Sequence, residues 1–185
     1  MVVKNALFYS KRTAYFTSLG IACGIVVHVT YCILGLAVII TKSLLLFNIL
    51  KYLGASYLVY IGIKSLFEKK AKITRGPALN VSEDLTPFAA WRQGFLCNVL
   101  NPKAALFFLG LFTLVINPNT SSWVETMYGA VFFLDTFLWF SFLSTIIHYP
   151  GVRTRINKVQ YYLAKGMGFF LILFGLELAF FRRPG

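Results

Sequence analysis

Long runs without a charged residue constrain this chain more than any other feature of its sequence. Residues 13–41 contain no Lys, Arg, Asp or Glu, and residues 104–124 contain none either. A helix needs about 20 consecutive apolar residues to cross the hydrocarbon core of a bilayer. Only 13% of the 185 residues are charged, whereas a soluble domain carries about 25%. The sequence therefore predicts an all-helical integral membrane protein in which the lipid bilayer is a partner along most of the chain.

The apolar runs divide the chain into five expected transmembrane helices within a single membrane domain that covers residues 1–185. A polar segment rich in Lys and Arg separates the second helix from the third, and we expect it to form a loop. The segment 88–100, which contains Trp91, Arg92 and Gln93, is expected to lie at the membrane interface or to begin the next helix. The expected spans are at about residues 14–41, 44–64, 102–124, 126–148 and 161–181, and the expected loop is at 65–90.

The distribution of positive charge predicts the orientation of these helices. Loops on the cytoplasmic side of a membrane protein carry an excess of Lys and Arg. With the N-terminus in the cytoplasm, 14 of the 18 Lys and Arg residues lie on the cytoplasmic side. We therefore expect an N-in, C-out topology for a multi-pass protein of the cell inner membrane. The net charge of +12 belongs to short loops, so nucleic acid is not an expected partner.

The motif Asn101-Pro102-Lys103 at the start of the third expected span is the strongest functional signal. Pro102 lacks an amide hydrogen and biases Asn101 away from helical angles, so a helix that arrives from Phe95 should break here. A helix that begins at Pro102 presents a positive end, to which Lys103 adds charge, and such an end suits an anionic group. Broken helices inside membranes line cavities in transporters. The alternative is a proline in the first turn of an ordinary interfacial helix.

Gly20, Gly24 and His28 are four residues apart and share one face of the first expected span. The glycines are expected to let a neighbouring helix approach closely. His28 is a costly residue inside a membrane unless it faces a cavity or a partner, so it is a candidate to bind a substrate carboxylate or to accept a proton. Packing alone is the alternative for all three residues.

Asp135 lies deep in the fourth expected span and is a second polar candidate. It could bind the ammonium group of a substrate or carry the proton that drives transport, and the alternative is a structural partner for His28. Lys51 and Glu177 are weaker candidates, because we expect their side chains to snorkel to the outer surface.

Motifs of soluble enzymes are missing from the sequence. It contains no Ser/His/Asp set, no HExxH motif and no phosphate-binding glycine loop, so we expect neither an enzyme nor a cofactor. The cysteines Cys23, Cys32 and Cys97 have no CxxC spacing, and they are expected to act as small apolar residues rather than metal ligands.

Three segments together resemble the LysE/RhtB family of amino-acid exporters, with the homoserine/threonine efflux branch as the nearer relative. The first runs from Trp91 through Gly94 to Phe108, the second covers residues 20–28 and the third covers 50–62. The tail at 166–178 is also similar to the last helix of the family. The resemblance implies export of a small neutral amino acid or a derivative, driven by the proton motive force. It also implies a substrate site framed by Asn101, Pro102 and Lys103, with His28 and Asp135 as polar groups.

Two departures from the family pattern qualify this expectation. Family members usually have six helices, and the first carries a Pro-Gly-Pro motif that this chain lacks, so the chain is expected to be one helix short. The family's Pro-Gln-Phe turn after the third span is replaced by Val115-Ile116-Asn117-Pro118. The rival interpretation is a truncated, transport-inactive protein or an accessory subunit, and the coding sequence upstream of Met1 would distinguish the two. The oligomeric state is not specified by the sequence, which is compatible with a homo-oligomer.

Overall fold

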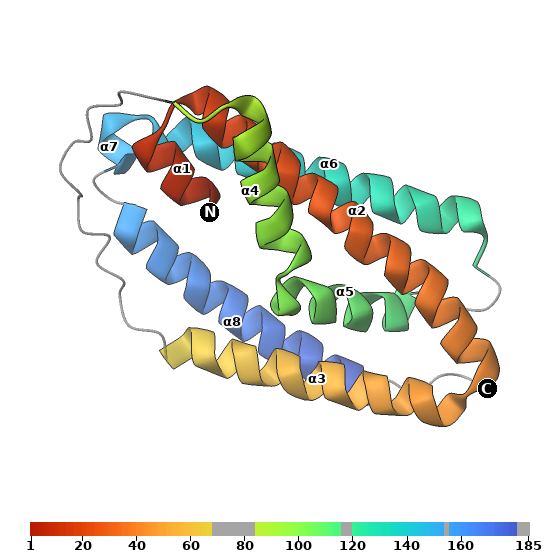
Figure 1. Ribbon diagram of the computed structural model, residues 1–185. Helices are drawn as coiled ribbons and strands as arrows, with labels where there is room; N and C mark the ends of the chain where they lie inside the picture. The colour runs from red at the N-terminus through yellow and green to blue at the C-terminus, as the bar shows by residue number, and fades with distance from the viewer. Residues whose placement is uncertain (68–83, 116–119, 154–155, 181–185) are drawn as a thin grey trace. The chain divides into compact units, whose positions relative to one another are not determined.

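The computed structural model describes residues 1–67, 84–115, 120–153 and 156–180. Every regular element in these four stretches is a helix, which confirms the predicted fold class. In chain order (Figure 1) the helices are α1 (Val2–Phe8), α2 (Lys11–Lys42), α3 (Leu44–Phe67), α4 (Pro87–Val99), α5 (Pro102–Val115), α6 (Ser122–Ile147), α7 (Pro150–Arg153) and α8 (Ile156–Phe180).

Among the described residues, four helices are long and apolar enough to cross a membrane. These candidate spans are Lys11–Gly35, Leu45–Phe67, Trp123–Ile147 and Tyr161–Phe180. A fifth span results if α4 and α5 are counted together as one interrupted helix. Alone, α5 has 14 residues, fewer than the roughly 20 that a span needs.

The polar segment and the third expected span are only partly described. Helix α3 continues to Phe67 and α4 begins at Pro87, so both helices extend into the segment 65–90. The helical part of the segment 102–124 that begins at Pro102 ends at Val115. Residues 68–83 and 116–119 lie outside the described residues.

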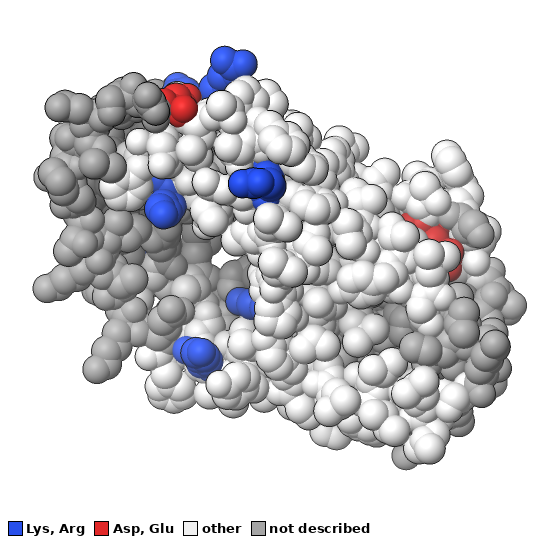
Figure 2. Space-filling view, in the orientation of Figure 1, with Lys and Arg blue, Asp and Glu red and all other residues white. Residues whose placement is uncertain are grey.

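Apolar side chains dominate the outer surface of the described helices. Among the large side chains that are more than half exposed are Leu45, Leu53, Phe67, Leu134 and Phe180. Most of the face drawn in Figure 2 is uncharged, and Lys and Arg form a few separate groups on it. A soluble monomer rarely exposes such continuous apolar surface, and a helix that faces lipid does so throughout. The surface is therefore that of a membrane protein.

The chain forms two compact units, to which several helices contribute in part. Unit 1 comprises Met1–Val27, Lys70–Asn101 and Tyr128–Gln160, and unit 2 comprises His28–Lys69, Pro102–Met127 and Tyr161–Gly185. The first half of α2 thus belongs to unit 1 and its second half to unit 2.

In unit 1, glycines bring the backbones of α2 and α4 into direct contact. A Cβ atom added to Gly20 would lie 2.0 Å from the Trp91 carbonyl oxygen, and one added to Gly94 would lie 2.1 Å from the Thr17 carbonyl oxygen. A Cβ atom on Gly24 would approach that of Asn98 to 2.9 Å. No larger residue fits at Gly20 or Gly94 unless the helices separate. Small residues at such crossings are a main way in which helices associate in lipid.

Polar side chains secure the same crossing. Asn98 is buried, and its Nδ2 donates a hydrogen bond of 2.8 Å to the Ile21 carbonyl oxygen. Asn5 of α1 is also buried, and its Nδ2 donates to Thr17 Oγ1 at 2.8 Å and to Gln93 Oε1 at 3.3 Å. Buried amide groups destabilise a structure unless they are hydrogen-bonded. These bonds therefore attach α1 and α4 to α2 at fixed positions.

The start of α2 is capped by Ser10 and by the carboxylate of Asp84. Ser10 Oγ accepts a hydrogen bond of 3.3 Å from the Thr13 N–H, as an N-cap residue does. The Asp84 carboxylate accepts from the Ser10 hydroxyl, from the Ser10 N–H at 3.3 Å and from the Thr13 hydroxyl at 2.6 Å. A negative charge at this end of a helix is stabilised by the helix dipole. The contact joins the residues that precede α4 to the start of α2.

These contacts also set the acidity of Asp84. Desolvation acts to raise the pKa of its carboxyl group. Hydrogen bonds from the side chains of Ser10 and Thr13 and from the backbone of Ser10 and Leu85 outweigh that effect, so the pKa lies below its usual value.

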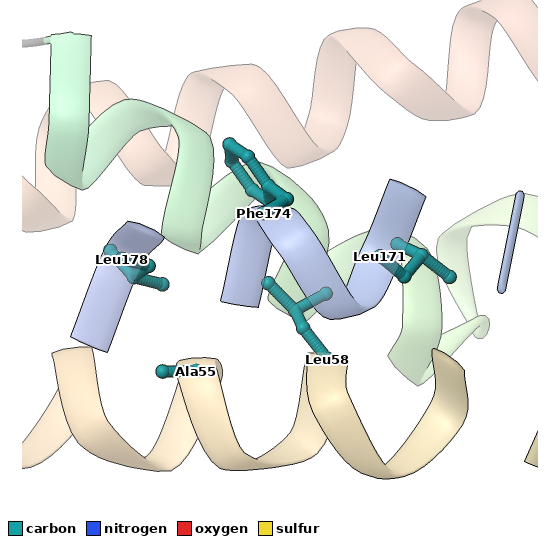
Figure 3. Close-up of a cluster of buried hydrophobic side chains, with 5 residues drawn as sticks. All are labelled: Ala55, Leu58, Leu171, Phe174 and Leu178. Atoms are coloured by element: carbon teal, nitrogen blue, oxygen red, sulfur yellow. The ribbon is translucent and has the colours of Figure 1, made fainter. Parts of the chain in front are cut away.

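Unit 2 is held together by α3, α5 and α8. A Cβ atom on Gly62 of α3 would lie 2.6 Å from the Gly168 carbonyl oxygen of α8, and one on Gly168 would lie 2.8 Å from that of Gly62. The Ser65 hydroxyl donates a hydrogen bond of 3.0 Å to the Ala164 carbonyl oxygen. The buried cluster shown in Figure 3 continues this contact, and its members are Ala55, Leu58, Leu171, Phe174 and Leu178.

Substituting Gly20 by Ala should destabilise unit 1, because even one methyl group collides with the α4 backbone. We expect a loss of about 1–3 kcal/mol in the free energy of unfolding, as for other overpacked contacts. Gly35→Ala is the matched control on the same helix, since nothing in the described part of the chain lies within 4 Å of a Cβ atom at Gly35. Thermal unfolding of both variants in detergent measures the difference. Equal melting temperatures would contradict the close crossing.

The Asp84 cap should weaken in acid. Because the folded-state pKa is lowered, the hydrogen bonds contribute stability above the unfolded-state pKa of about 3.9, and this contribution is lost as the pH falls through the folded-state pKa. Hydrogen exchange of residues 10–14, corrected for intrinsic rates, should therefore rise as the pH is lowered from about 5 towards 3. Asp84→Asn should show faster exchange already at neutral pH and little further change. An identical acid response in both proteins would rule out the cap.

Candidate functional site

The interruption between α4 and α5 is where the sequence predicts it. Helix α4 begins at Pro87 after the N-cap Thr86, whose side chain accepts from the Ala89 N–H, and it ends at Val99. Leu100 has left the helical region, with φ −86° and ψ 7°. The Asn101 N–H donates to the Asn98 carbonyl oxygen at 2.9 Å, which tightens the last turn. Pro102 then begins α5.

The residues of the predicted motif therefore occupy the end of one helix and the first turn of the next. Asn101 and Lys103 are half-buried and Pro102 is exposed. The first N–H groups of any helix have no partner within it, and together with the helix dipole they create a positive end. Lys103 adds a positive side chain in the first turn of α5. This combination can bind a carboxylate group.

His28 is buried in unit 2, with 1% of its surface exposed. Its Nδ1 atom lies 2.8 Å from the Tyr31 hydroxyl oxygen. Its ring stacks on Phe108 of α5, with 5.9 Å between ring centroids and 13° between the ring planes. The imidazole thus joins the second half of α2 to α5. Such a group can donate or accept a proton in an otherwise apolar setting.

Asp135 is exposed on α6, in the part of that helix that belongs to unit 1. Asn101 belongs to unit 1 as well, whereas His28, Pro102 and Lys103 belong to unit 2. A carboxylate in a span is costly when it faces lipid, and the role of Asp135 in the site stays a prediction.

Two charged side chains are also buried among the described residues of unit 2. Lys51 is 6% exposed and Glu125 is 8% exposed. The expectation that Lys51 snorkels to the surface is wrong, whereas Glu177 is indeed exposed. Lys51 is spaced by four residues from both Phe47 and Ala55, which are buried on the same face of α3. Because α3 is apolar on every side, this spacing does not distinguish the buried face in the sequence. Glu125 lies in the first turn of α6, where a negative charge is favourable.

The described residues offer no metal site. Within the four described stretches, no three His, Cys, Asp or Glu side chains are grouped so that they could hold a metal ion. The thiols of Cys23, Cys32 and Cys97 are free.

The described residues have an apolar outer surface, form four or five candidate spans and include an interrupted helix with a charged first turn. These features define a multi-span membrane protein. The sequence matches the family described as LysE type translocator over residues 1–181. The chain belongs to this family, whose members are transporters and not enzymes.

Similar proteins cover most of the chain. An uncharacterized membrane protein of Bacillus subtilis, YrhP, is 34% identical over 96% of this chain and 87% of its own length. The threonine efflux protein of Escherichia coli K12 is 26% identical over 96% of this chain and 86% of its own length. The leucine efflux protein of Salmonella choleraesuis is 30% identical over 85% of this chain and 76% of its own length. No solved structure matches the chain.

Proposed function

We propose that this protein exports small neutral amino acids, or derivatives similar to homoserine and threonine, from the cytoplasm across the inner membrane. Family membership over residues 1–181 is the observation that carries the proposal. The similarity to proteins named for threonine and leucine efflux supports this substrate class. The N-in, C-out orientation follows from the excess of Lys and Arg that it places on the cytoplasmic side.

In this proposal, Asn101, Pro102 and Lys103 frame the substrate site at the cytoplasmic mouth of the interrupted span. The substrate carboxylate meets the amide groups of the first turn of α5 and the side chain of Lys103. Pro102 keeps α4 and α5 from joining into one helix, since it supplies no N–H for a continuous ladder.

Export is coupled to the proton motive force, with His28 and Asp135 as the groups that bind the substrate's polar atoms or carry the proton. The burial of His28 supports its role in this group of residues. A titratable ring inside a span costs free energy, and such residues are retained where they serve a function. Alternating access then moves one group of helices against another around the site.

Pro102→Ala and Lys103→Ala should each reduce efflux of threonine or leucine from preloaded cells. Lys103→Ala removes a charge-assisted hydrogen bond to the substrate, so we expect efflux to fall roughly tenfold or more. Pro102→Ala lets the helix continue through the site. Lys158→Ala removes an exposed Lys from the start of α8 and serves as the control. Rates are compared at equal amounts of membrane-inserted protein. Wild-type efflux in both site variants would exclude this site.

The two histidines allow a matched test of proton coupling. His28→Gln retains a polar amide but cannot titrate, so efflux from proteoliposomes should no longer respond to an imposed pH gradient. His148→Gln should retain the response, because His148 lies at the end of α6 in unit 1 and its Nδ1 donates to the Ser144 carbonyl oxygen. A gradient response that survives in both variants would remove His28 from the proton pathway.

A further inference from the structure

The outer face of α6 carries a carboxyl group at the centre of a candidate span. The span runs from Trp123 to Ile147, and Asp135 is twelve residues from each end, or about 18 Å at the rise of an α-helix. Its side chain is exposed. A long Lys or Arg side chain can reach the membrane interface from inside a span, but an aspartate side chain is too short to do so from this depth.

The described residues do not supply a polar partner for this group. No hydrogen bond or ion pair within the described part of the chain involves Asp135. Acidic side chains in a span are costly in contact with lipid, and they almost always face a partner or the interior of a bundle. Asp135 therefore calls for a polar group that comes from outside the described residues.

Apolar side chains surround Asp135 on the same face of α6. Val131, Leu134, Leu138 and Phe142 are 56%, 54%, 63% and 59% exposed, and all four belong to unit 1. Because they are three or four residues apart, they form one stripe along the helix, with the spacing that two helices use in a left-handed contact. The share of buried residues is 11% in this span and between 28% and 44% in the other three. The described helices thus leave the α6 stripe uncovered.

We propose that the α6 stripe is the contact surface between two copies of this chain, with the two Asp135 carboxyl groups paired at its centre. Copies of one chain share the orientation that their Lys and Arg residues set. A twofold axis along the membrane normal therefore brings each residue of the stripe to the same depth as its counterpart. A protein of another kind would have to carry a polar group at that depth, whereas a second copy does so by symmetry.

Carboxyl groups are able to form such a pair with each other. In its protonated form a carboxyl group has one O–H donor and further acceptor capacity, so two of them can exchange hydrogen bonds. Polar contacts of this kind stabilise the association of helices in lipid. A paired carboxyl group can still take up and release a proton, so the pairing is compatible with the role of proton carrier proposed for Asp135. It does not depend on which substrate is exported.

Disulfide cross-linking of the full chain in native membranes tests the contact surface. Cys97, which is exposed, is first replaced by Ser. Leu134→Cys should then give a covalent dimer on mild oxidation, because equivalent residues at such a contact approach the Cα separation of about 4.4–6.8 Å that a disulfide allows. Leu53→Cys is the matched control, since Leu53 is a 61% exposed leucine on α3 and should give no dimer. Equal cross-linking of both variants, no cross-linking of Leu134→Cys, or its attachment to a different protein would overturn the inference.

The dissociation constant of the dimer tests the carboxyl pair. It is measured by energy transfer between labelled copies in lipid vesicles of decreasing protein-to-lipid ratio. Asp135→Leu should raise it roughly 3- to 30-fold, the effect of losing one polar contact between helices in lipid. Asp135→Asn should change it by less than about twofold, because an amide also donates and accepts. Glu177→Leu is the control, since it removes an exposed carboxyl group from α8.

An unchanged dissociation constant in Asp135→Leu would exclude the carboxyl pair. A wild-type chain that stays monomeric at every protein-to-lipid ratio would contradict the contact surface as well.

Discussion

Direct backbone contact between helices is the constraint on which both units depend. Water drives apolar surfaces together in soluble proteins, but lipid is as apolar as a leucine side chain and provides no such force. Helices in a membrane must therefore gain from close packing and from hydrogen bonds between them. Unit 1 achieves this at Gly20 and Gly94, and unit 2 does so at Gly62 and Gly168. In each case the glycines of two helices face the partner's carbonyl groups, so neither helix can accept a larger residue alone.

Hydrogen bonds from side chains to carbonyl oxygens accompany both contacts. Asn98 donates to Ile21 in unit 1, and Ser65 donates to Ala164 in unit 2. Such a bond fixes how far one helix is shifted along the axis of the other. Glycine contacts alone leave this axial shift adjustable. The rest of each unit, including the aromatic and leucine core around Phe174, is then assembled on a defined pair of helices.

The fold class and the helix interruption at Pro102 could be predicted from the sequence. Both depend on local properties, namely the length of the uncharged runs and the backbone chemistry of proline. The inward and outward faces were harder to predict. Helix α3 is apolar on every side, so periodicity does not reveal that Lys51 points inward or that Leu53 points out. The segment 88–100, which is expected to lie at the membrane interface or to begin the next helix, forms most of α4, and the sequence does not reveal that this helix has a buried face made of Ala90, Gly94 and Asn98. Lipid removes the polar–apolar contrast that identifies a buried face in soluble proteins, so such faces become visible only when neighbouring helices are known.

The continuity of α2 has a mechanical consequence. Its hydrogen-bond ladder runs without interruption from Lys11 to Lys42, through the point where the chain passes from unit 1 to unit 2. A helix resists torsion, because rotating one half against the other breaks that ladder. Within unit 1, Gly20 and Gly24 are one turn apart on this helix and face Trp91 and Asn98 of α4. The rotation of α2 about its axis that these glycine contacts impose is therefore shared by Thr17, and it sets the direction of the hydroxyl that accepts from Asn5 of α1.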